Sequence, residues 1–121
     1  MTEARLSLGR WGEDQAVVYL RRQGLKIIER NLRTPVGEID IIARHGRTLV
    51  FIEVKTRRSL AYGTPQEAVG PVKQRQILRA AQWYLADIGA VGTQSRFDVI
   101  AILAGNGDAR IEHIPDAFGL R

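Results

Sequence analysis

The segment Gly37–Lys55, GEIDIIARHGRTLVFIEVK, places two apolar runs on either side of a short polar turn, and it decides the expected fold. The alternation from Glu38 to Ile41 has the period of a β-strand. The run Leu49–Ile52 is short and rich in β-branched residues, which favours a second strand over a helix. Glycine in the intervening turn is typical of a β-hairpin. The segment therefore predicts two antiparallel strands.

The register of this hairpin brings acidic side chains together. With the loop at residues 45 and 46, Glu38 faces Glu53 and Asp40 lies one rung away. Side chains alternate faces along a strand, so the three acids and Lys55 project from one side. Facing like charges destabilise a hairpin, and a divalent cation would offset the repulsion. Because Mg²⁺ prefers carboxylate oxygens, the pattern predicts a metal site.

An ordinary hairpin is the alternative to this metal site. Each charge taken alone fits a hairpin whose wet face carries solvated side chains. A three-residue loop would also separate the acids, because a one-residue slip moves every side chain to the other face. The grouping of the acids with a Glu-x-Lys ending on an apolar strand favours the site.

Length and composition are those of one globular domain over residues 1–121. The chain has no cysteine, which excludes disulfides, thiolate catalysis and cysteine-ligated zinc. It has neither a run of about 20 apolar residues nor a signal-peptide core, so we expect a cytoplasmic protein without a membrane partner. The net charge of +5 favours a nucleic-acid partner, and a solubilising basic surface is the alternative.

The sequence outside the hairpin predicts a mixed α/β fold in the order αβββαββ, with helices flanking the sheet. Apolar residues at helical spacing and capping residues mark the helices, and β-branched runs between turn signals mark the strands. The first three strands are expected to form an antiparallel meander, and no clear element is expected from Pro115 onward. The further expected elements are Met1–Gln23, Leu25–Arg33, a helix start at Thr64–Glu67, Pro71 to about Gly89, Ser95–Leu103 and Ala109–Ile114.

Several side chains outside the hairpin could complete the site. Glu13 would reach the acids if the first helix packs across the hairpin, although a helical glutamate is more often solvated. Lys73 and Gln74, at the start of the long helix, could bind a phosphate. The alternative for them is a solvated lysine and a structural hydrogen bond. Arg57 and Arg58 follow the hairpin in a loop, where substrate contacts are expected.

Asp98 stands in the otherwise apolar run Ser95–Leu103. A buried acid needs a partner, and we expect Arg96, Lys73 or a backbone amide to supply it. The residue is interpreted as structural.

The order of elements, with Asp40 followed by Glu53-Val54-Lys55, resembles the PD-(D/E)xK, or restriction-endonuclease-like, nuclease superfamily. The chain is similar over nearly its whole length to the YraN family of small uncharacterised bacterial proteins. One residue departs from the nuclease motif, because Ile39 rather than proline precedes Asp40. The matching segments are Gly9–Glu13, Asn31–Arg33, Gly37–Ile42, Val50–Arg57, Lys73–Gln74 and Arg96–Val99.

This resemblance implies a restriction-endonuclease-like core and a metal-dependent endonuclease. Asp40 and Glu53 would bind Mg²⁺ or Mn²⁺, with the Val54 carbonyl as a third ligand, and Lys55 would assist the attacking water. The residues at positions that are catalytic or polar in the superfamily are Asp40, Glu53, Lys55, Glu13 and Gln74.

Three functions stay open on these grounds. The first is a Mg²⁺-dependent nuclease on branched or structured DNA, where the branched substrate follows from the resemblance and a homodimer would suit the cutting of two strands. RNA is a variant substrate, although no RNA-specific motif is present. The second is a nucleic-acid-binding protein without catalysis. The third is a small module whose basic surface binds an acidic protein.

Overall fold

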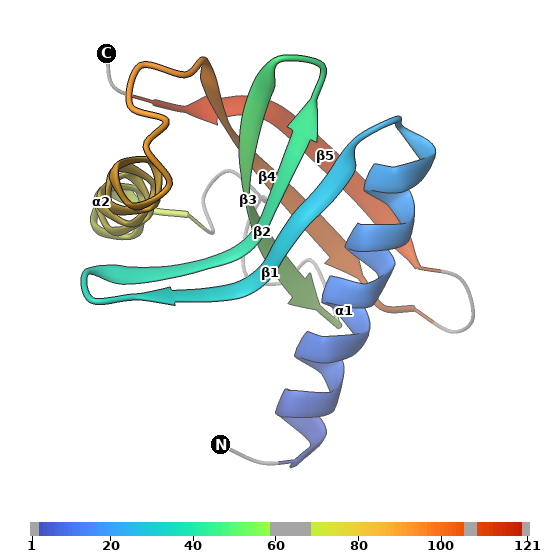
Figure 1. The fold of residues 1–121 in the computed structure, drawn as a ribbon. Coiled ribbons are helices and arrows are strands. Elements are labelled where there is room, and N and C mark those ends of the chain that lie inside the picture. Colours follow the sequence, from blue (N-terminus) through green and yellow to red (C-terminus); the bar gives the residue numbers. More distant parts are fainter. Residues whose placement is uncertain (1–2, 59–68, 106–108, 120–121) are drawn as a thin grey trace.

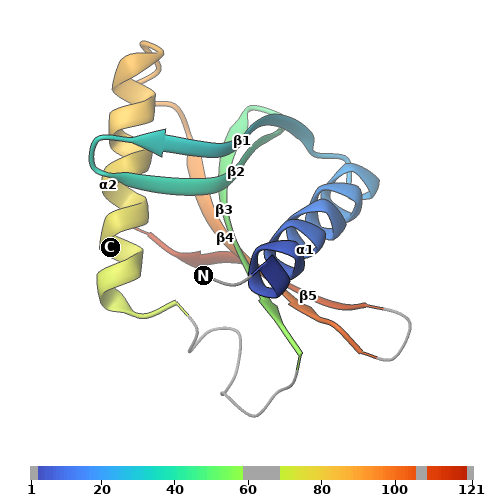
Figure 2. The ribbon, with the colours of Figure 1, turned by 90° about the horizontal axis from the view of Figure 1, so that it is seen from below.

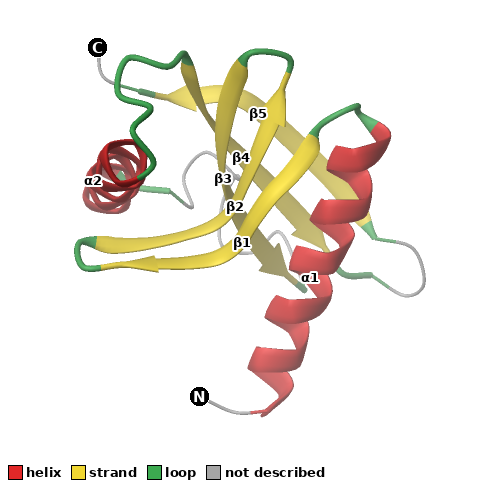
Figure 3. Ribbon diagram, viewed as in Figure 1, coloured by secondary structure: helices red, strands yellow, loops and turns green. Residues whose placement is uncertain are grey.

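The computed structural model describes residues 3–58, 69–105 and 109–119. In this part of the chain the elements follow the predicted order αβββαββ (Figures 1 and 3). The helix start expected at Thr64–Glu67 lies outside the described residues. The elements are α1 (Glu3–Arg22), β1 (Lys26–Thr34), β2 (Gly37–His45), β3 (Thr48–Arg57), α2 (Pro71–Asp87), β4 (Ser95–Leu103) and β5 (Arg110–Phe118).

The strands form one mixed sheet in the order β1-β2-β3-β4-β5. The pairs β1–β2, β2–β3 and β4–β5 are antiparallel, and β3–β4 is parallel. The connection between the parallel strands contains α2, as expected because parallel neighbours need a long crossover. The predicted α/β class and three-strand meander are therefore confirmed.

The two helices cover opposite faces of the sheet, which gives three layers (Figure 2). On one face, α1 buries Ala16, Val17 and Leu20. On the other face, α2 packs over the stacked rings of Phe51 and Phe97. A sheet covered on both faces needs apolar residues on both, which explains the nearly continuous apolar runs of the central strands. Neither described helix combines the length and the apolar character needed to cross a lipid bilayer.

The last strand is longer than expected. β5 runs through Pro115 to Phe118, where no element was predicted. Proline is tolerated because β5 lies at the edge of the sheet, and its pairing with β4 is irregular next to Asp116, which has a φ of 51°. Phe118 is buried with its ring 5.4 Å from that of Phe97. This long-range ring contact extends the strand beyond the point that the local sequence indicates.

The hairpin of β1 and β2 extends past the sheet and reaches α2 (Figures 1 and 2). The β2–β3 pairing ends at Ile41 and Ile52, although β2 begins at Gly37 and β3 continues to Arg57. The hairpin tip rests on α2, since a Cβ on Gly37 would lie 3.2 Å from the carbonyl oxygen of Gln76. The two strands thus diverge and leave a gap bordered by residues 37–40 and 53–57, which we call the fork.

Candidate functional site

The loop between β2 and β3 differs from the expected one and changes the register of the acids. Gly46 takes the first of two loop positions with a φ of 63°, a conformation that favours glycine. The expected loop at residues 45 and 46 is therefore wrong by one position, and the pairing shifts by two residues. Asp40, rather than Glu38, comes level with Glu53. An even shift keeps the expected face of each strand.

Asp40 and Glu53 form a pair of neighbouring carboxyl groups in the fork. Asp40 directly precedes Ile41 and Glu53 directly follows Ile52, and Ile41 and Ile52 are the last paired residues of the two strands. Glu53 is only 4% exposed, and its pKa is raised to about 7, with burial as the largest cause. The charge of Asp40 and a hydrogen bond between the two carboxyl groups contribute to the same rise. Two such acids are costly to hold together unless a proton or a cation neutralises one of them.

The backbone of β3 holds the Asp40 side chain in place. The amide nitrogen of Val54 donates a hydrogen bond of 2.8 Å to Oδ2 of Asp40. The regular β2–β3 pairing has already ended at this point, so β2 offers no backbone carbonyl to the Val54 amide. The Asp40 carboxylate accepts its hydrogen bond instead. One carboxylate of the pair is therefore oriented by the fold itself.

Two lysines approach the buried member of the pair. Nζ of Lys55 lies 3.5 Å and Nζ of Lys73 lies 3.7 Å from Oε1 of Glu53. Both ammonium groups lower the pKa of Glu53, but burial and Asp40 outweigh them. Lys73 comes from the first turn of α2, and of the three alternative partners considered for Asp98 it is the one that pairs with Glu53 instead.

A cavity of about 1170 Å³ opens between α1 and the fork. Asp40, Val54 and Lys55 line it from the sheet. The helix comes close because residue 12 is glycine: a Cβ on Gly12 would collide with the hydroxyl of Thr56 and lie 2.8 Å from its Cβ. The distance between α1 and the end of β3, and with it the shape of the cavity, depends on this contact.

Glu13 reaches the same cavity from α1, as expected for a helix that packs beside the hairpin. Its Oε1 accepts hydrogen bonds of 3.0 Å from Nε of Arg30 and from Nδ2 of Asn31. Glu13 therefore joins α1 to β1. Asn31 and Arg30 were missed as site residues, since nothing in their local sequence indicates a contact with the first helix.

The other predicted site residues lie around the fork. Nε2 of Gln74 donates to the carbonyl of Val69 at 2.9 Å, which is the structural hydrogen bond considered as the alternative. Arg57 is half-buried and interacts with another group of the chain, and Arg58 is exposed. Within the described residues, no three histidine or acidic side chains come together as a metal-binding group. A metal centre here would therefore use two carboxylates.

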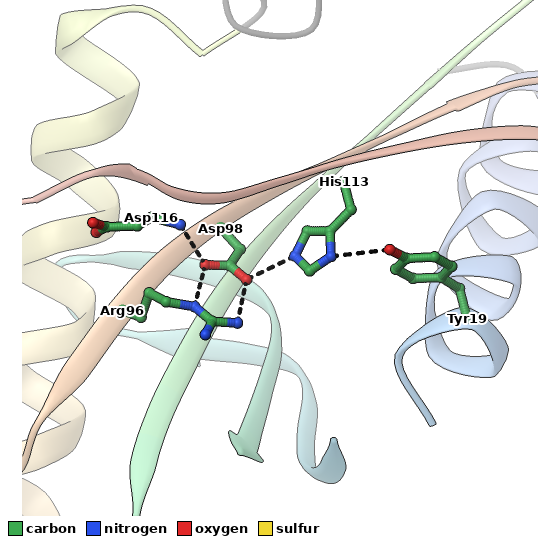
Figure 4. Close-up of polar contacts among 5 residues, drawn as sticks. All are labelled: Tyr19, Arg96, Asp98, His113 and Asp116. Atoms are coloured by element: carbon green, nitrogen blue, oxygen red, sulfur yellow. Dashed lines mark hydrogen bonds and ion pairs between the residues drawn. The ribbon is translucent and has the colours of Figure 1, made fainter. Parts of the chain in front are cut away.

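A second polar cluster surrounds Asp98, which is completely buried in β4 (Figure 4). Its carboxylate accepts two hydrogen bonds of 2.9 Å from Arg96 and one of 2.9 Å from the amide of Asp116. Nε2 of His113 lies 2.8 Å from the same carboxylate, and its Nδ1 lies 3.1 Å from the hydroxyl of Tyr19. The cluster connects α1, β4 and β5.

Charge and hydrogen bonding determine the state of this cluster. Burial raises the pKa of Asp98, but the hydrogen bonds from His113, Arg96 and the Asp116 amide outweigh it and lower the pKa overall. An ionised carboxylate only accepts, so Nε2 of His113 carries a proton and donates a hydrogen bond to Asp98. Arg96 and a backbone amide were predicted as partners and are confirmed. His113 and Tyr19 were missed.

The family model and the similar proteins found by comparison all belong to one family. The model described as uncharacterised protein family UPF0102 matches residues 12–102, which include the fork. A UPF0102 protein of Syntrophotalea carbinolica is 65% identical over 118 residues, which cover 98% of this chain and 96% of that protein. UPF0102 proteins of Geobacter sulfurreducens and Rhodococcus jostii are 56% and 51% identical, covering 93% of this chain and 89% and 97% of their own lengths. The predicted YraN-like family is thereby confirmed.

Proposed function

The chain belongs to the uncharacterised protein family UPF0102, and we propose that it is a metal-dependent nuclease that hydrolyses phosphodiester bonds in structured or branched DNA. The observation that carries this proposal is the contact between the carboxyl groups of Asp40 and Glu53 beside a cavity that Lys55 lines. Phosphodiester hydrolysis assisted by a divalent cation uses groups of these kinds. The order αβββαββ adds support for a restriction-endonuclease-like core.

The donor set fits a hard divalent cation. Mg²⁺ is commonly bound by one or two carboxylates with several waters, and Asp40 and Glu53 supply two. Burial and the charge of Asp40 raise the pKa of Glu53 in spite of Lys55 and Lys73, so the pair can take up a further positive charge. The carbonyl of Val54 is the third ligand in this proposal. When bound, Mg²⁺ or Mn²⁺ contributes Lewis-acid chemistry, which lowers the pKa of water and neutralises charge on the phosphodiester.

Lys55 is assigned to the reacting phosphate. Its ammonium group lies 3.5 Å from Glu53 and its side chain lines the cavity. A cation held at this place stabilises the negative charge that develops on the phosphate oxygens as water attacks. Lys73 approaches Glu53 from α2 and balances its charge, so Lys55 is able to turn toward the substrate.

Glu13 and Gln74 are assigned positioning roles. The hydrogen bonds of Glu13 to β1 hold the α1 wall of the cavity opposite the fork. The hydrogen bond of Gln74 to Val69 holds the start of α2, from which Lys73 reaches Glu53. Both residues therefore act through other groups.

Cleavage assays test the proposal. Labelled four-way junction, flap, linear duplex and single-stranded DNA are incubated with the protein while Mg²⁺ or Mn²⁺ is titrated. We expect divalent-dependent cutting of at least one branched substrate, and loss of that cutting in Asp40→Ala and Glu53→Gln. Glu112→Gln, which changes an exposed acid of β5, is the matched control. Equal cutting by the wild type and Glu53→Gln would contradict the proposal.

A nucleic-acid-binding protein without catalysis is the second candidate, and one observation favours it. The described residues bring no third acid to Asp40 and Glu53, while Lys55 and Lys73 already lie near Glu53. Lysines and a proton can neutralise such a pair without a metal. Salt-sensitive DNA binding that Asp40→Ala leaves unchanged, in the absence of any cleavage, would favour this function.

A further inference from the structure

The cavity beside the fork carries arginines that were not among the predicted binding residues. Arg10 of α1 and Arg30 and Arg33 of β1 line it together with Lys55. Cations grouped around one cavity suit an anionic ligand. The acids nearby decide which of these cations can bind it.

Arg30 is committed to the protein itself. Its Nε lies 3.0 Å from Glu13 and its Nη2 lies 2.6 Å from Asp14, so it pairs with two carboxylates of α1. The neighbouring Asn31 adopts a φ of 52° and also donates to Glu13. Asparagine tolerates this left-handed conformation better than most residues. These contacts attach α1 to β1, and Arg30 is therefore not available to a second anion.

Arg10 and Arg33 are held much less firmly. Arg10 is exposed one turn before Glu13, and among the described residues no carboxylate forms an ion pair with it. Arg33 lies 3.5 Å from Glu38, but the two side chains are 86% and 67% exposed. Exposed pairs of this kind are weak. Either arginine can therefore turn to a phosphate at little cost.

The arginine-bearing wall is continuous with the candidate metal centre. In the β1–β2 pairing, residue 30 faces residue 41 and residue 32 faces residue 39. Asn31 of β1 therefore lies level with Asp40 of β2. Arg33 follows two residues later on β1, and Arg10 faces the same cavity from α1. Arg10, Arg33 and Asp40 therefore line one continuous cavity.

We propose that this wall is the nucleic-acid-binding surface of the protein, and that Arg10 and Arg33 contact phosphates flanking the one at Asp40 and Glu53. The inference rests on the proposed function for the kind of polyanion, and it assigns the path of the strand across α1 and β1. This path replaces the predicted one along the segment after β3.

Two of the predicted phosphate ligands, Lys73 and Arg57, are less suited to this role. Lys73 contacts Glu53 at 3.7 Å. Arg57 is half-buried and interacts with another group of the chain. Arg10 and Arg33 are both exposed and both line the cavity.

Fluorescence anisotropy tests this surface with a fluorescein-labelled four-way junction and a linear duplex. EDTA is present, so cleavage does not contribute. Arg10→Ala and Arg33→Ala are compared with Arg22→Ala and Arg47→Ala, which remove exposed arginines from the far end of α1 and from the β2–β3 loop. Each cavity variant is expected to weaken binding about five- to tenfold and to reduce the salt slope by about one. The controls are expected to change binding by less than about twofold.

The outcomes separate this inference from the proposed chemistry. Equal losses in all four variants would overturn it, because they would indicate a general attraction to the basic protein. Failure of the wild type to bind either DNA at low salt would overturn it as well. Binding that depends on Arg10 and Arg33, without cleavage in Mg²⁺, would support it while contradicting the nuclease function. The charge reversal Arg10→Glu should weaken binding more than Arg10→Ala, and thermal unfolding confirms that each variant is folded.

Discussion

Oδ2 of Asp40 and the amide nitrogen of Val54 lie 2.8 Å apart, and this contact joins β2 to β3 just beyond the end of their regular pairing. The same carboxylate lies against Glu53. Asp40 therefore supports the fork and supplies half of the candidate metal centre. Substitutions can separate these two roles, because asparagine keeps an oxygen acceptor but loses the charge.

Asp40→Asn is expected to fold with nearly wild-type stability, since its side-chain oxygen can accept from Val54. Asp40→Ala leaves that amide without its partner and should lower the free energy of unfolding by about 1–3 kcal/mol. Urea unfolding at neutral pH measures both variants. Neither should bind Mn²⁺ in a calorimetric titration. Equal stability of the two variants would contradict the role of the hydrogen bond.

Glu53 is expected to make the metal-free protein less stable as the pH rises. Its pKa of about 7 in the folded protein exceeds the ordinary 4.5, so the folded state retains a proton that the unfolded state releases. The stabilisation is complete below the unfolded value and is lost as the pH rises through about 7, by about 3 kcal/mol at most. Urea unfolding between about pH 5 and pH 8 measures it.

Glu53→Gln provides the decisive comparison for this pH dependence. The variant has no carboxyl group at this position and should lose most of the slope, while Glu112→Gln, an exposed change on β5, should keep it. Added Mn²⁺ should stabilise the wild type above about pH 7 and leave Glu53→Gln unaffected. A slope that persists in Glu53→Gln would assign the titration to another group.

Lys55→Met is expected to reduce the cleavage rate while leaving divalent binding nearly intact. Methionine keeps most of the apolar length of lysine but removes the cation that stabilises charge on the phosphate, so kcat should fall about 100-fold or more. Single-turnover cleavage and Mn²⁺ titration measure the two effects separately. Lys26→Met, which changes an exposed lysine of β1, is the control. Equal cleavage rates for Lys55→Met and Lys26→Met would contradict a role of Lys55 in the reaction.

Gly12→Ala is expected to destabilise the protein although alanine is the better helix former. The added Cβ collides with Thr56, and the overpacking should cost about 1–3 kcal/mol, more than the gain of about 1 kcal/mol in helix propensity. Thermal unfolding measures the change. The cost should shrink in a Thr56→Ala background, because two of the three contacting atoms are then absent. Strict additivity of the two substitutions would contradict the proposed collision.

Asp98→Asn is expected to cost about 3–5 kcal/mol, because it leaves Arg96 without its charge partner at a buried site. The lowered pKa of Asp98 contributes stability above its unfolded value, and this contribution is lost as the pH falls through the lower folded value. The variant should therefore show a weaker loss of stability in acid than the wild type. Urea unfolding at neutral pH and at about pH 3 measures both effects, with the exposed Asp87→Asn as control.

Local sequence predicted most of the fold because the sheet is covered on both faces. Continuous apolar runs between turn signals located the strand Ser95–Leu103 at its observed bounds and the long helix from Pro71. The same reasoning failed after Pro115, where a long-range contact between Phe118 and Phe97 extends an edge strand. It also misplaced the β2–β3 loop, which depends on the backbone angle of a single glycine.

The sequence by itself determined the order of helices and strands and the grouping of Asp40, Glu53 and Lys55 around the fork, because one hairpin carries all three residues and chain connectivity keeps them close. Only the tertiary structure decided what surrounds them. The approach of Lys73 to Glu53 and the contact between Tyr19 and His113, 94 residues apart, depend on how the two helices pack on the sheet. Such packing depends on the shapes of distant surfaces, which spacing along the chain does not encode.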